Sequence, residues 1–296
     1  MVKCKKELNK INKLLTVVIP CYMCDKYLAD CFDSISVNRN RNINFLFVDD
    51  GSTDNTNGLI SKFCEDKEDC TLITNEQNMG CPESRIVGIK TTNSKYIFNF
   101  DADNILPKGL LLNILNYVES NDNKHHLCAV SEIRYFKEKK EDVCKVTHIR
   151  SFDDKPYDFN DVFKNFENPF SSGNYIYTRE CWDNVGRHEP NSNRFESWYF
   201  SLKCVINGYT FNVCPDTFYY HRQGIDSLSV TTKKNDLDKK TMYKLLLNHL
   251  DILTSESVIK LNKSGYKKAR KLVGSNSLKI NDKVSNWIRD NEKHLS

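Results

Sequence analysis

The first half of the chain alternates short apolar runs with stretches whose apolar residues recur at helical spacing. Residues 14–19 form an almost continuous apolar, β-branched run, which predicts a strand buried on both faces of a parallel sheet. We expect Pro20 to end this strand, and the spacing of apolar positions predicts a helix over residues 27–37. Further strands are predicted at 44–48, 71–74, 96–100 and 127–133, and further helices at 57–63, 82–90 and 110–118.

Strands that alternate with helices over residues 14–133 predict an α/β fold with a doubly wound, mainly parallel sheet. The second half is less regular. A charged loop is expected at 137–142, a short aromatic helix at 158–166, a turn at 170–174 that leads into 175–177, and helices at 179–185 and 196–206. Beyond residue 233 the chain is rich in lysine and has amphipathic stretches, which predict a helical C-terminal extension over residues 233–296.

Composition is typical of a globular protein with a sizeable core. The 296 residues are 39% hydrophobic, and 43 basic against 39 acidic side chains leave a formal charge of +4, so we expect no nucleic-acid partner. The sequence contains neither an apolar run of membrane-spanning length nor a signal peptide, which predicts a cytoplasmic protein. The lysine-rich residues 260–271 leave open a peripheral contact with an anionic membrane, although a solvated helical face is favoured, and a homo-oligomer stays an open alternative.

Cysteine spacing raises one alternative function. Among twelve cysteines, Cys21 and Cys24 have the spacing of a redox pair and lie between a predicted strand and a predicted helix. No second pair at this spacing completes a zinc site. A thiol redox protein is therefore the last-ranked hypothesis.

Acidic side chains follow two of the predicted strands at the point where each strand ends. Asp101 and Asp103 come directly after residues 96–100, and Asp50 follows residues 44–48. Ligands of open α/β sheets bind beyond the carboxyl ends of the strands, and hard divalent cations take carboxylate and phosphate oxygens. Glycine-rich dinucleotide and P-loop fingerprints are missing from the sequence. The pattern favours a nucleotide bound by side chains and a metal ion, although turn and cap roles are the alternative for such acids.

Four ordered motifs resemble those of glycosyltransferase family 2, whose members have the GT-A fold. They are Pro20-Cys21-Tyr22, Val48-Asp49-Asp50-Gly51-Ser52-Thr53-Asp54, Asn78-Met79-Gly80 with Ser84-Arg85 and Gly88, and Phe100-Asp101-Ala102-Asp103-Asn104. Ser84 and Ile86 depart from the family pattern. The resemblance extends over residues 16–230 and implies a domain at 1–232, with a nucleotide-sugar half at 14–120 and an acceptor half at 121–232.

The resemblance also implies roles for individual residues. Pro20 belongs to the turn in which Tyr22 holds the nucleobase together with Asp50, and Arg85 lies nearby. Asp101 contacts the ribose or the metal. The implied metal ligands are Asp103, as the principal one, and His221, with Mn²⁺ or Mg²⁺ as the cofactor. Arg222 is expected to face the diphosphate.

The catalytic base is the position at which this sequence departs most from the family. Members present Glu-Asp at the start of the helix that ends in Gly-Tyr, and counting back from Gly208 places Glu196 and Ser197 there. Serine is no general base near neutral pH without an activator, so Glu196 is the candidate. Asp183 and Glu189 are fallbacks. A favourable charge in the first turn of its helix is the alternative role of Glu196.

The resemblance therefore implies a metal-dependent inverting glycosyltransferase of the hexosyl or N-acetylhexosaminyl type. It would move a sugar from a nucleoside diphosphate-sugar, with UDP expected as the commonest nucleotide of similar proteins, to a hydroxyl of a glycan, lipid-linked or protein acceptor. The serine at position 197 supports one alternative. In that alternative, the chain is a nucleotide-sugar- or glycan-binding homologue with weak or lost transferase activity.

Overall fold

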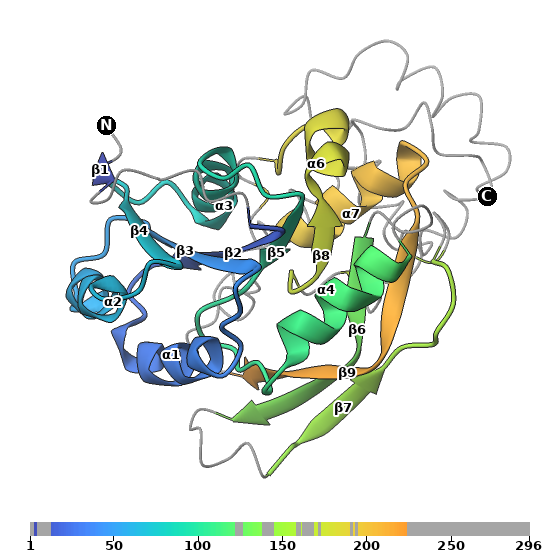
Figure 1. The fold of residues 1–296 in the computed structure, drawn as a ribbon, viewed down its shortest axis with the longest axis horizontal. Coiled ribbons are helices and arrows are strands. Elements are labelled where there is room, and N and C mark those ends of the chain that lie inside the picture. The colour runs from blue at the N-terminus through green and yellow to red at the C-terminus, as the bar shows by residue number, and fades with distance from the viewer. Residues whose placement is uncertain are drawn as a thin grey trace, which may run out of the picture.

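In the part of the chain that the computed structural model describes, nine strands form one mixed sheet with helices on both faces (Figure 1). The structure describes residues 3–4, 13–121, 127–137, 145–157, 161, 169–170, 173–189, 192 and 195–223. The predicted extension 233–296 lies outside these residues, as do nearly all of the predicted loop 137–142 and the predicted helix 158–166.

The strands are β1 (Lys3–Cys4), β2 (Leu15–Cys21), β3 (Ile43–Asp49), β4 (Cys70–Thr74), β5 (Tyr96–Asn99), β6 (Leu127–Lys137), β7 (His148–Ser151), β8 (Ile176–Thr178) and β9 (Phe211–Gln223). The helices are α1 (Leu28–Ser36), α2 (Thr56–Cys64), α3 (Cys81–Lys90), α4 (Leu110–Ser120), α6 (Arg179–Val185) and α7 (Glu196–Ile206), and a 3-10 turn η1 (Asp25–Tyr27) precedes α1. The predicted mainly parallel α/β sheet is thereby confirmed.

Strands β4, β3, β2 and β5 run parallel in that order and form the centre of the sheet. Strand β8 pairs antiparallel with both β5 and β6, and β9 pairs parallel with β6. Because β2, β3 and β5 are parallel neighbours, their carboxyl ends lie at one edge of the sheet. The acidic residues that follow these strands are thus brought to one place.

The prediction that Pro20 ends the first strand is wrong. Strand β2 continues to Cys21, and Pro20 pairs with Val48 of β3. Pairing between β2 and β5 already stops at Val18 and Asn99. Pro20 lies beyond that point, where the missing N–H interrupts no ladder on the β5 side.

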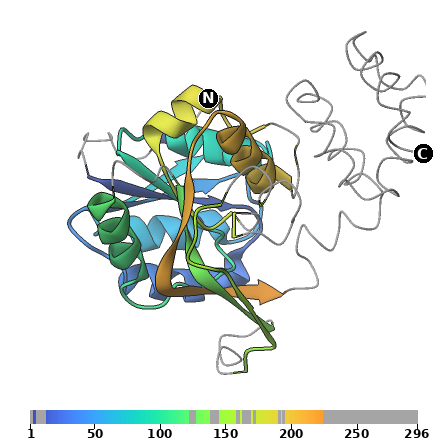
Figure 2. The same ribbon diagram turned by 90° about the vertical axis from the view of Figure 1, so that its right-hand side faces the viewer.

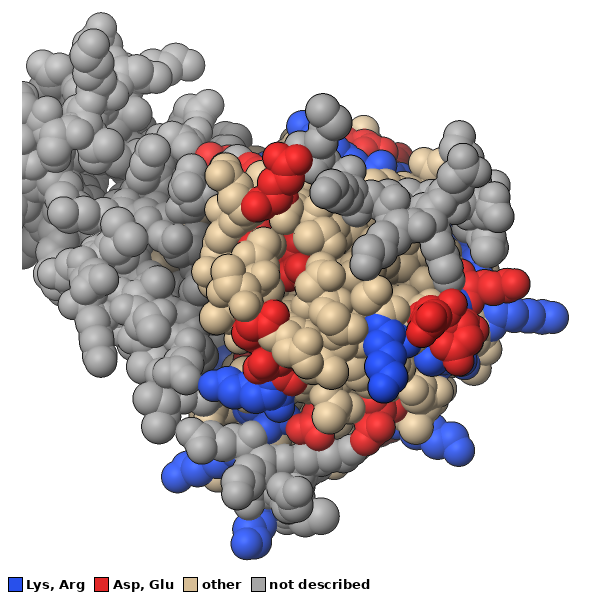
Figure 3. Space-filling view, turned by 90° about the vertical axis from the view of Figure 1, so that its left-hand side faces the viewer, with Lys and Arg blue, Asp and Glu red and all other residues tan. Residues whose placement is uncertain are grey.

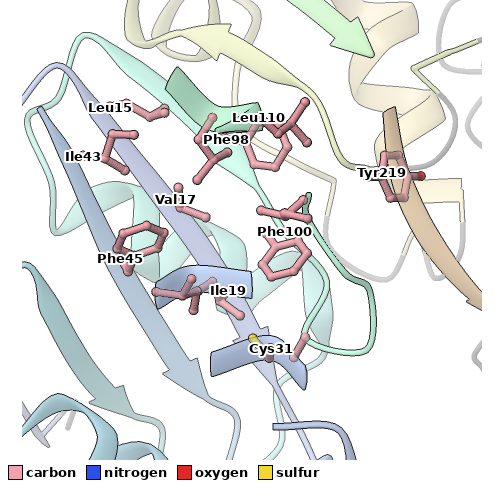
Figure 4. Close-up of a cluster of buried hydrophobic side chains, with 14 of the residues drawn as sticks. Leu15, Val17, Ile19, Cys31, Ile43, Phe45, Phe98, Phe100, Leu110 and Tyr219 are labelled. Carbon is pink, nitrogen blue, oxygen red and sulfur yellow. The ribbon is translucent and has the colours of Figure 1, made fainter. Parts of the chain in front are cut away.

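The two faces of β2 contribute to separate cores. On one face Leu15, Val17 and Ile19 point together towards Phe45 and Phe98 (Figure 4), and α1, α2 and α4 cover this layer. On the other face Val18 packs in the layer formed with α3, α6 and α7. Burial on both faces explains why the β2 sequence is apolar at nearly every position instead of alternating.

Strand β9 was not predicted from the sequence, and it runs beside β6 for most of its length (Figure 2). A register shift between Val130 and Glu132 bends this pairing. Near its end, Tyr220 exchanges backbone hydrogen bonds with Ile105, which follows β5. This bridge places His221 and Arg222 next to the segment that carries Asp101 and Asp103.

The surface carries charges of both signs. On the face shown in Figure 3, acidic and basic side chains are interspersed, as the nearly balanced formal charge predicts. Among the helices that the structure describes, none is long and apolar enough to cross a membrane.

Candidate functional site

Asp50, directly after β3, is buried and organises the loop that follows β4. Its carboxylate accepts hydrogen bonds from the Asn75 side chain at 2.8 Å and from the backbone N–H groups of Met79 at 3.0 Å and Gly80 at 2.7 Å. Its own N–H donates to Cys21 of β2 at 2.8 Å. Asp50 therefore ties three chain segments together at the edge of the sheet, and a carboxylate with three donors keeps limited capacity for a nucleobase.

Two further acids, at the end of β3 and just before α2, stabilise turns. Asp49 accepts hydrogen bonds from the N–H of Ser52 at 3.1 Å and from the side chain of Asn57 at 2.7 Å. Asp54 accepts from the N–H of Thr56 at 3.0 Å, in the first turn of α2. These contacts give Asp49 a turn role and Asp54 a role at the start of α2.

Tyr22 leaves β2 at the same edge and is 51% exposed. It is followed by Met23, whose φ of 49° is positive and whose N–H donates to Ser52 Oγ at 3.1 Å. Pro20, the first residue of the Pro-x-Tyr turn, is fixed in the strand. The turn thus presents a solvent-accessible aromatic face next to Asp50, which is the chemistry that stacking on a base requires.

Arg85 in α3 is buried and joins the segment that carries Asp101 to the start of α7. Its guanidinium donates to Asp101 at 2.6 Å, to Ser197 Oγ at 2.9 Å and, through a very short contact, to Glu196. Gly173 allows this approach, because a Cβ at that position would lie 2.9 Å from Ser197 Oγ and 3.1 Å from an Arg85 nitrogen. Its φ of 86° also favours glycine.

Glu196, the predicted base, is 3% exposed and begins α7. Burial favours the protonated form, but Arg85 and then His188 outweigh it and lower the pKa of Glu196 to about 2. One Glu196 oxygen accepts hydrogen bonds from Arg85 and from the Ser197 hydroxyl, the latter at 3.0 Å. The other Glu196 oxygen lies 2.5 Å from His188 Nδ1. The carboxylate is ionised but covered by protein groups, so its role as a base stays a prediction.

The fallback acids lie elsewhere. Asp183 is exposed on α6, and Glu189 is half-buried after that helix. Arg85 has no contact with either of them among its hydrogen bonds and ion pairs in the described part of the chain. Their roles as a base also stay predictions.

The predicted metal ligands, Asp103 and His221, both lie near enough to Asp101 for its charge to act on their pKa values. Burial, followed by the nearby charge of Asp101, raises the pKa of the Asp103 carboxyl to about 7. Among the described residues, buried His221 Nδ1 has no hydrogen-bond partner, and burial lowers the pKa of the ring while Asp101 opposes this shift. The structure thus places Asp103 and His221 around Asp101, and it leaves His221 Nδ1 without a hydrogen bond from the described residues.

Protein side chains by themselves do not enclose a metal ion here. Among the described residues, no three histidine, cysteine, aspartate or glutamate side chains are grouped closely enough to hold one. Mg²⁺ is usually held by one or two carboxylates and completed by substrate phosphates and water. Asp103 and His221 fit such a substrate-bridged ion.

Arg222 makes contacts that differ from the expected ones. Arg222, which was predicted to contact the phosphates, is 3% exposed. It donates hydrogen bonds to the Asp30 carboxylate of α1 at 2.5 Å and to the backbone oxygen of Asp103 at 2.8 Å. Its guanidinium also lies over the rings of Tyr27 and Phe136. In this structure Arg222 holds the Asp103 segment against α1, and its contact with a diphosphate stays a prediction.

The thiol redox hypothesis is disfavoured by the surroundings of the cysteine pair. Cys21 and Cys24 are 2% and 8% exposed. Contact with Cys24, followed by burial, raises the pKa of Cys21 well above that of a free thiol. Reactive cysteines need an accessible, low-pKa thiolate, which Cys21 lacks.

Several polar residues of the site were missed by sequence reasoning. The Asn174 side chain accepts a hydrogen bond from the Asp101 backbone N–H at 3.1 Å and donates one to the Asp101 carboxylate at 3.3 Å. Asn104 accepts a hydrogen bond from the Arg222 backbone N–H at 3.1 Å. The position of Asn75 directly after β4 was a usable signal, since Asp50 occupies the same place after β3. For His188 the sequence offers no signal, because a lone histidine is commonly structural.

Comparison with protein-family models gives a match over most of the chain. The family described as Glycosyl transferase family 2 matches residues 16–228. Among curated relatives, glycosyltransferase GlyG of Streptococcus pneumoniae is 29% identical over 112 residues, which are 38% of this chain and 37% of GlyG. The minor teichoic acid biosynthesis protein GgaB of Bacillus subtilis is 25% identical over 41% of this chain and 14% of its own length. The matched part is well under half of each of these relatives.

Solved structures share the fold at low sequence identity. TarS 1-349 of S. aureus, in complex with UDP-GlcNAc, has a TM-score of 0.64 and 16% identity over 83% of this chain and 72% of that chain. The mannosyltransferase PcManGT of Pyrobaculum calidifontis, in complex with GDP-Man and Mn²⁺, has a TM-score of 0.58 and 14% identity over 98% of this chain and 84% of that chain. Because the family match extends from the first central strand through β9 and the fold agrees with it, this chain belongs to glycosyl transferase family 2.

Proposed function

We propose that this protein is a metal-dependent, inverting glycosyltransferase that moves a sugar from a nucleoside diphosphate-sugar to an acceptor hydroxyl. The observation that carries the proposal is the meeting of Tyr22, Asp50, Asp101 and Asp103 at one edge of a family 2 sheet, with His221 brought there by β9. These groups supply a stacking face, hydrogen-bond acceptors and metal-type ligands at the carboxyl ends of parallel strands.

The donor is proposed to be a UDP-sugar with a hexosyl or N-acetylhexosaminyl group. The UDP-GlcNAc complex of TarS supports UDP, whereas the GDP-Man complex of PcManGT shows that the same fold also binds GDP. Tyr22 and Asp50 would contact the base, with Pro20 fixing their turn. Asp101, held by Arg85 and Asn174, would contact the ribose.

The cofactor is proposed to be Mn²⁺ or Mg²⁺, held by Asp103 and His221. A divalent ion supplies neutralisation of the negative charge that develops on the diphosphate when the sugar bond breaks. The support within this chain is the buried His221 Nδ1 atom, which has no hydrogen-bond partner among the described residues, and the Asp103 carboxylate, which lies near Asp101. Arg222 would steady the Asp103 segment and add positive charge near the phosphates.

The transfer itself is proposed to be a direct displacement. The acceptor oxygen forms a bond with the anomeric carbon, the bond to the diphosphate oxygen breaks, the nucleoside diphosphate leaves, and the acceptor proton passes to a base. Glu196 is the predicted base, and the acceptor would be a glycan, a lipid-linked molecule or a protein. In the structure Glu196 is covered by Arg85, Ser197 and His188.

A nucleotide-release assay tests the proposal. The purified chain would be incubated with Mn²⁺ and a panel of UDP- and GDP-sugars, with EDTA and an Asp103→Asn variant as negative controls. Asp66→Asn, at an exposed position after α2, is the matched control. We expect slow hydrolysis of one donor that EDTA and Asp103→Asn abolish and Asp66→Asn leaves unchanged.

Two other results would argue against the enzyme. If UDP and GDP with metal present fail to raise the melting temperature, the nucleotide-sugar proposal is wrong. If one nucleotide binds but neither hydrolysis nor transfer to a panel of acceptors occurs, the chain is a binding homologue, which the serine at position 197 would explain.

A further inference from the structure

We infer that His188 and Glu196 are positioning residues for the donor: together they fix the guanidinium of Arg85, which in turn aims Asp101 at the nucleotide. This inference rests on the proposed function, and it assigns Glu196 a role different from that of acceptor base. It also gives a function to His188, which no sequence motif singled out.

The first step is the fixed contact between Arg85 and Asp101. Arg85 is 3% exposed, and one of its terminal nitrogens donates to an Asp101 oxygen at 2.6 Å. The Asp101 side chain is 28% exposed, so it is the member of the pair that solvent or a ligand can reach. Asn174 holds the second Asp101 oxygen at 3.3 Å. The orientation of Asp101 is therefore set from the protein side.

The second step is the contact that fixes Arg85 itself. Its other terminal nitrogen donates to Glu196 and to Ser197 Oγ. A buried guanidinium with only one carboxylate partner would be free to turn about its bond to that partner. With carboxylates on both terminal nitrogens, Arg85 is held as a rigid bridge between α7 and the Asp101 segment.

The third step is the part that His188 plays behind Glu196. Its ring is 1% exposed, with Nδ1 2.5 Å from the Glu196 oxygen that Arg85 does not contact and Nε2 3.2 Å from the Tyr177 hydroxyl. Phe200 packs against the ring at a centroid distance of 4.4 Å. Because both ring nitrogens have a polar neighbour and one face is packed, His188 cannot turn without losing contacts. It therefore fixes the rotamer of Glu196.

The same contacts argue against a direct role of Glu196 in proton abstraction. Each of its oxygens already faces a protein group, and the carboxylate is 3% exposed. An acceptor hydroxyl must come within hydrogen-bond distance of its base. Ser197, which occupies the slot of the usual aspartate, donates its hydroxyl to Glu196 and so adds to the anchor.

The test is nucleotide affinity, because a positioning role and a base role predict opposite results. UDP binding with Mn²⁺ would be measured by calorimetry for the full chain, for Glu196→Gln and for His188→Phe, below the melting temperature of every variant. We expect the Kd to rise about tenfold or more in both variants, a loss typical of removing a group that orients a ligand contact. His188→Gln, which keeps a polar group near Glu196, should recover part of the affinity.

Asp69→Asn is the matched control, since Asp69 forms a two-bond ion pair with Arg39 away from the site. It should lower the melting temperature and leave the Kd unchanged. The inference is overturned if Glu196→Gln binds UDP like the full chain and loses only kcat, or if affinity falls with melting temperature in the control as well. If the unaltered chain binds neither UDP nor GDP, the proposed function fails first, which distinguishes the two failures.

Discussion

Arg222 in β9 donates a hydrogen bond of 2.5 Å to Asp30 in α1, although 192 positions separate them in the chain. The Arg222 side chain is 2% exposed and the Asp30 side chain 18%. This pair fastens the last described strand, which carries His221, to the first helix of the sheet. The family resemblance predicted that Arg222 faces the diphosphate, whereas in the structure Arg222 pairs with Asp30 inside the protein.

Breaking this pair should destabilise the fold. Asp30→Ala leaves a buried guanidinium without its carboxylate, and we expect a loss of about 2 kcal/mol in the free energy of unfolding, somewhat less than for a fully buried pair. Urea denaturation measures it. Glu119→Ala, which breaks the exposed Lys95–Glu119 pair, is the control and should change stability by about 0.5 kcal/mol or less. Equal losses in the two variants would contradict the importance of the Arg222–Asp30 pair.

Replacing Asp50 should remove both loop order and ligand binding. In Asp50→Ala the N–H groups of Met79 and Gly80 lose the carboxylate that accepts from them. We expect a loss of about 1–3 kcal/mol in stability and no rise in melting temperature on addition of UDP and Mn²⁺.

Asp54→Ala is the comparison for Asp50, because Asp54 also lies between β3 and α2 but accepts its hydrogen bonds from the N–H groups of Thr56 and Asp25. It should cost about 1 kcal/mol of stability and keep the thermal shift on ligand addition. A normal thermal shift in Asp50→Ala would count against its role at the nucleobase.

Two helical glycines should respond to alanine with opposite signs. At Gly88 in α3, a Cβ would lie 2.6 Å from a Val18 methyl and 3.1 Å from a Val48 methyl, both on β-branched side chains of the sheet. Gly88→Ala is therefore expected to cost about 1–3 kcal/mol by overpacking. Thermal or urea unfolding would measure the change.

At Gly58 in α2, such a Cβ would meet, among the described residues and outside the backbone of that helix, the Asn55 side chain, with the amide oxygen at 2.8 Å. This flexible group can move, so Gly58→Ala should gain up to about 1 kcal/mol from helix propensity. A stabilised Gly88→Ala would show that α3 can move away from β2.

Acid should remove the stability that the Glu196 network provides. The pKa of Glu196 is lowered from 4.5 to about 2, so the folded state binds its proton less readily than the unfolded state. A carboxyl group whose pKa is lowered by folding stabilises the folded state at pH values above its pKa in the unfolded state. This contribution is lost as the pH falls from about 4.5 towards 2. The shift corresponds to about 3 kcal/mol.

The measurement is the unfolding free energy of the chain and of Glu196→Gln across this pH range. The difference between the two should shrink as the pH falls through the window. Glu119→Gln, at an exposed position, should show no comparable trend. A constant difference for Glu196→Gln would mean that its carboxylate is not selectively stabilised in its ionised form.

Much of the fold follows from local sequence patterns. The apolar run of β2 and the helical spacing of α1 and α4 predicted these elements to within a few residues, because burial on one or both faces dictates their composition. Asp50 and Asp101 were found for a related reason. The carboxyl ends of neighbouring parallel strands meet at one edge, so a residue that directly follows such a strand is placed by the topology alone.

Contacts between segments that lie far apart in the chain could not be predicted from the sequence. The extent of β9 depends on its pairing with β6, whose register shifts at a bulge, and β7 was not predicted because its few residues carry no apolar alternation. The position of Pro20 inside β2 depended on where pairing with β5 stops. Each of these features is decided by a partner strand and not by the residues themselves.

By itself, the sequence determined the order of strands and helices from β2 to β6, the family motifs and the placing of Asp50, Asp101 and Asp103 at strand ends. Only the tertiary structure decided that Arg222 pairs with Asp30 and that Glu196 lies buried between Arg85 and His188. The physical reason is that a charged side chain in the interior takes whichever partner the packing brings within reach. That partner is set by the joining of elements more than a hundred residues apart.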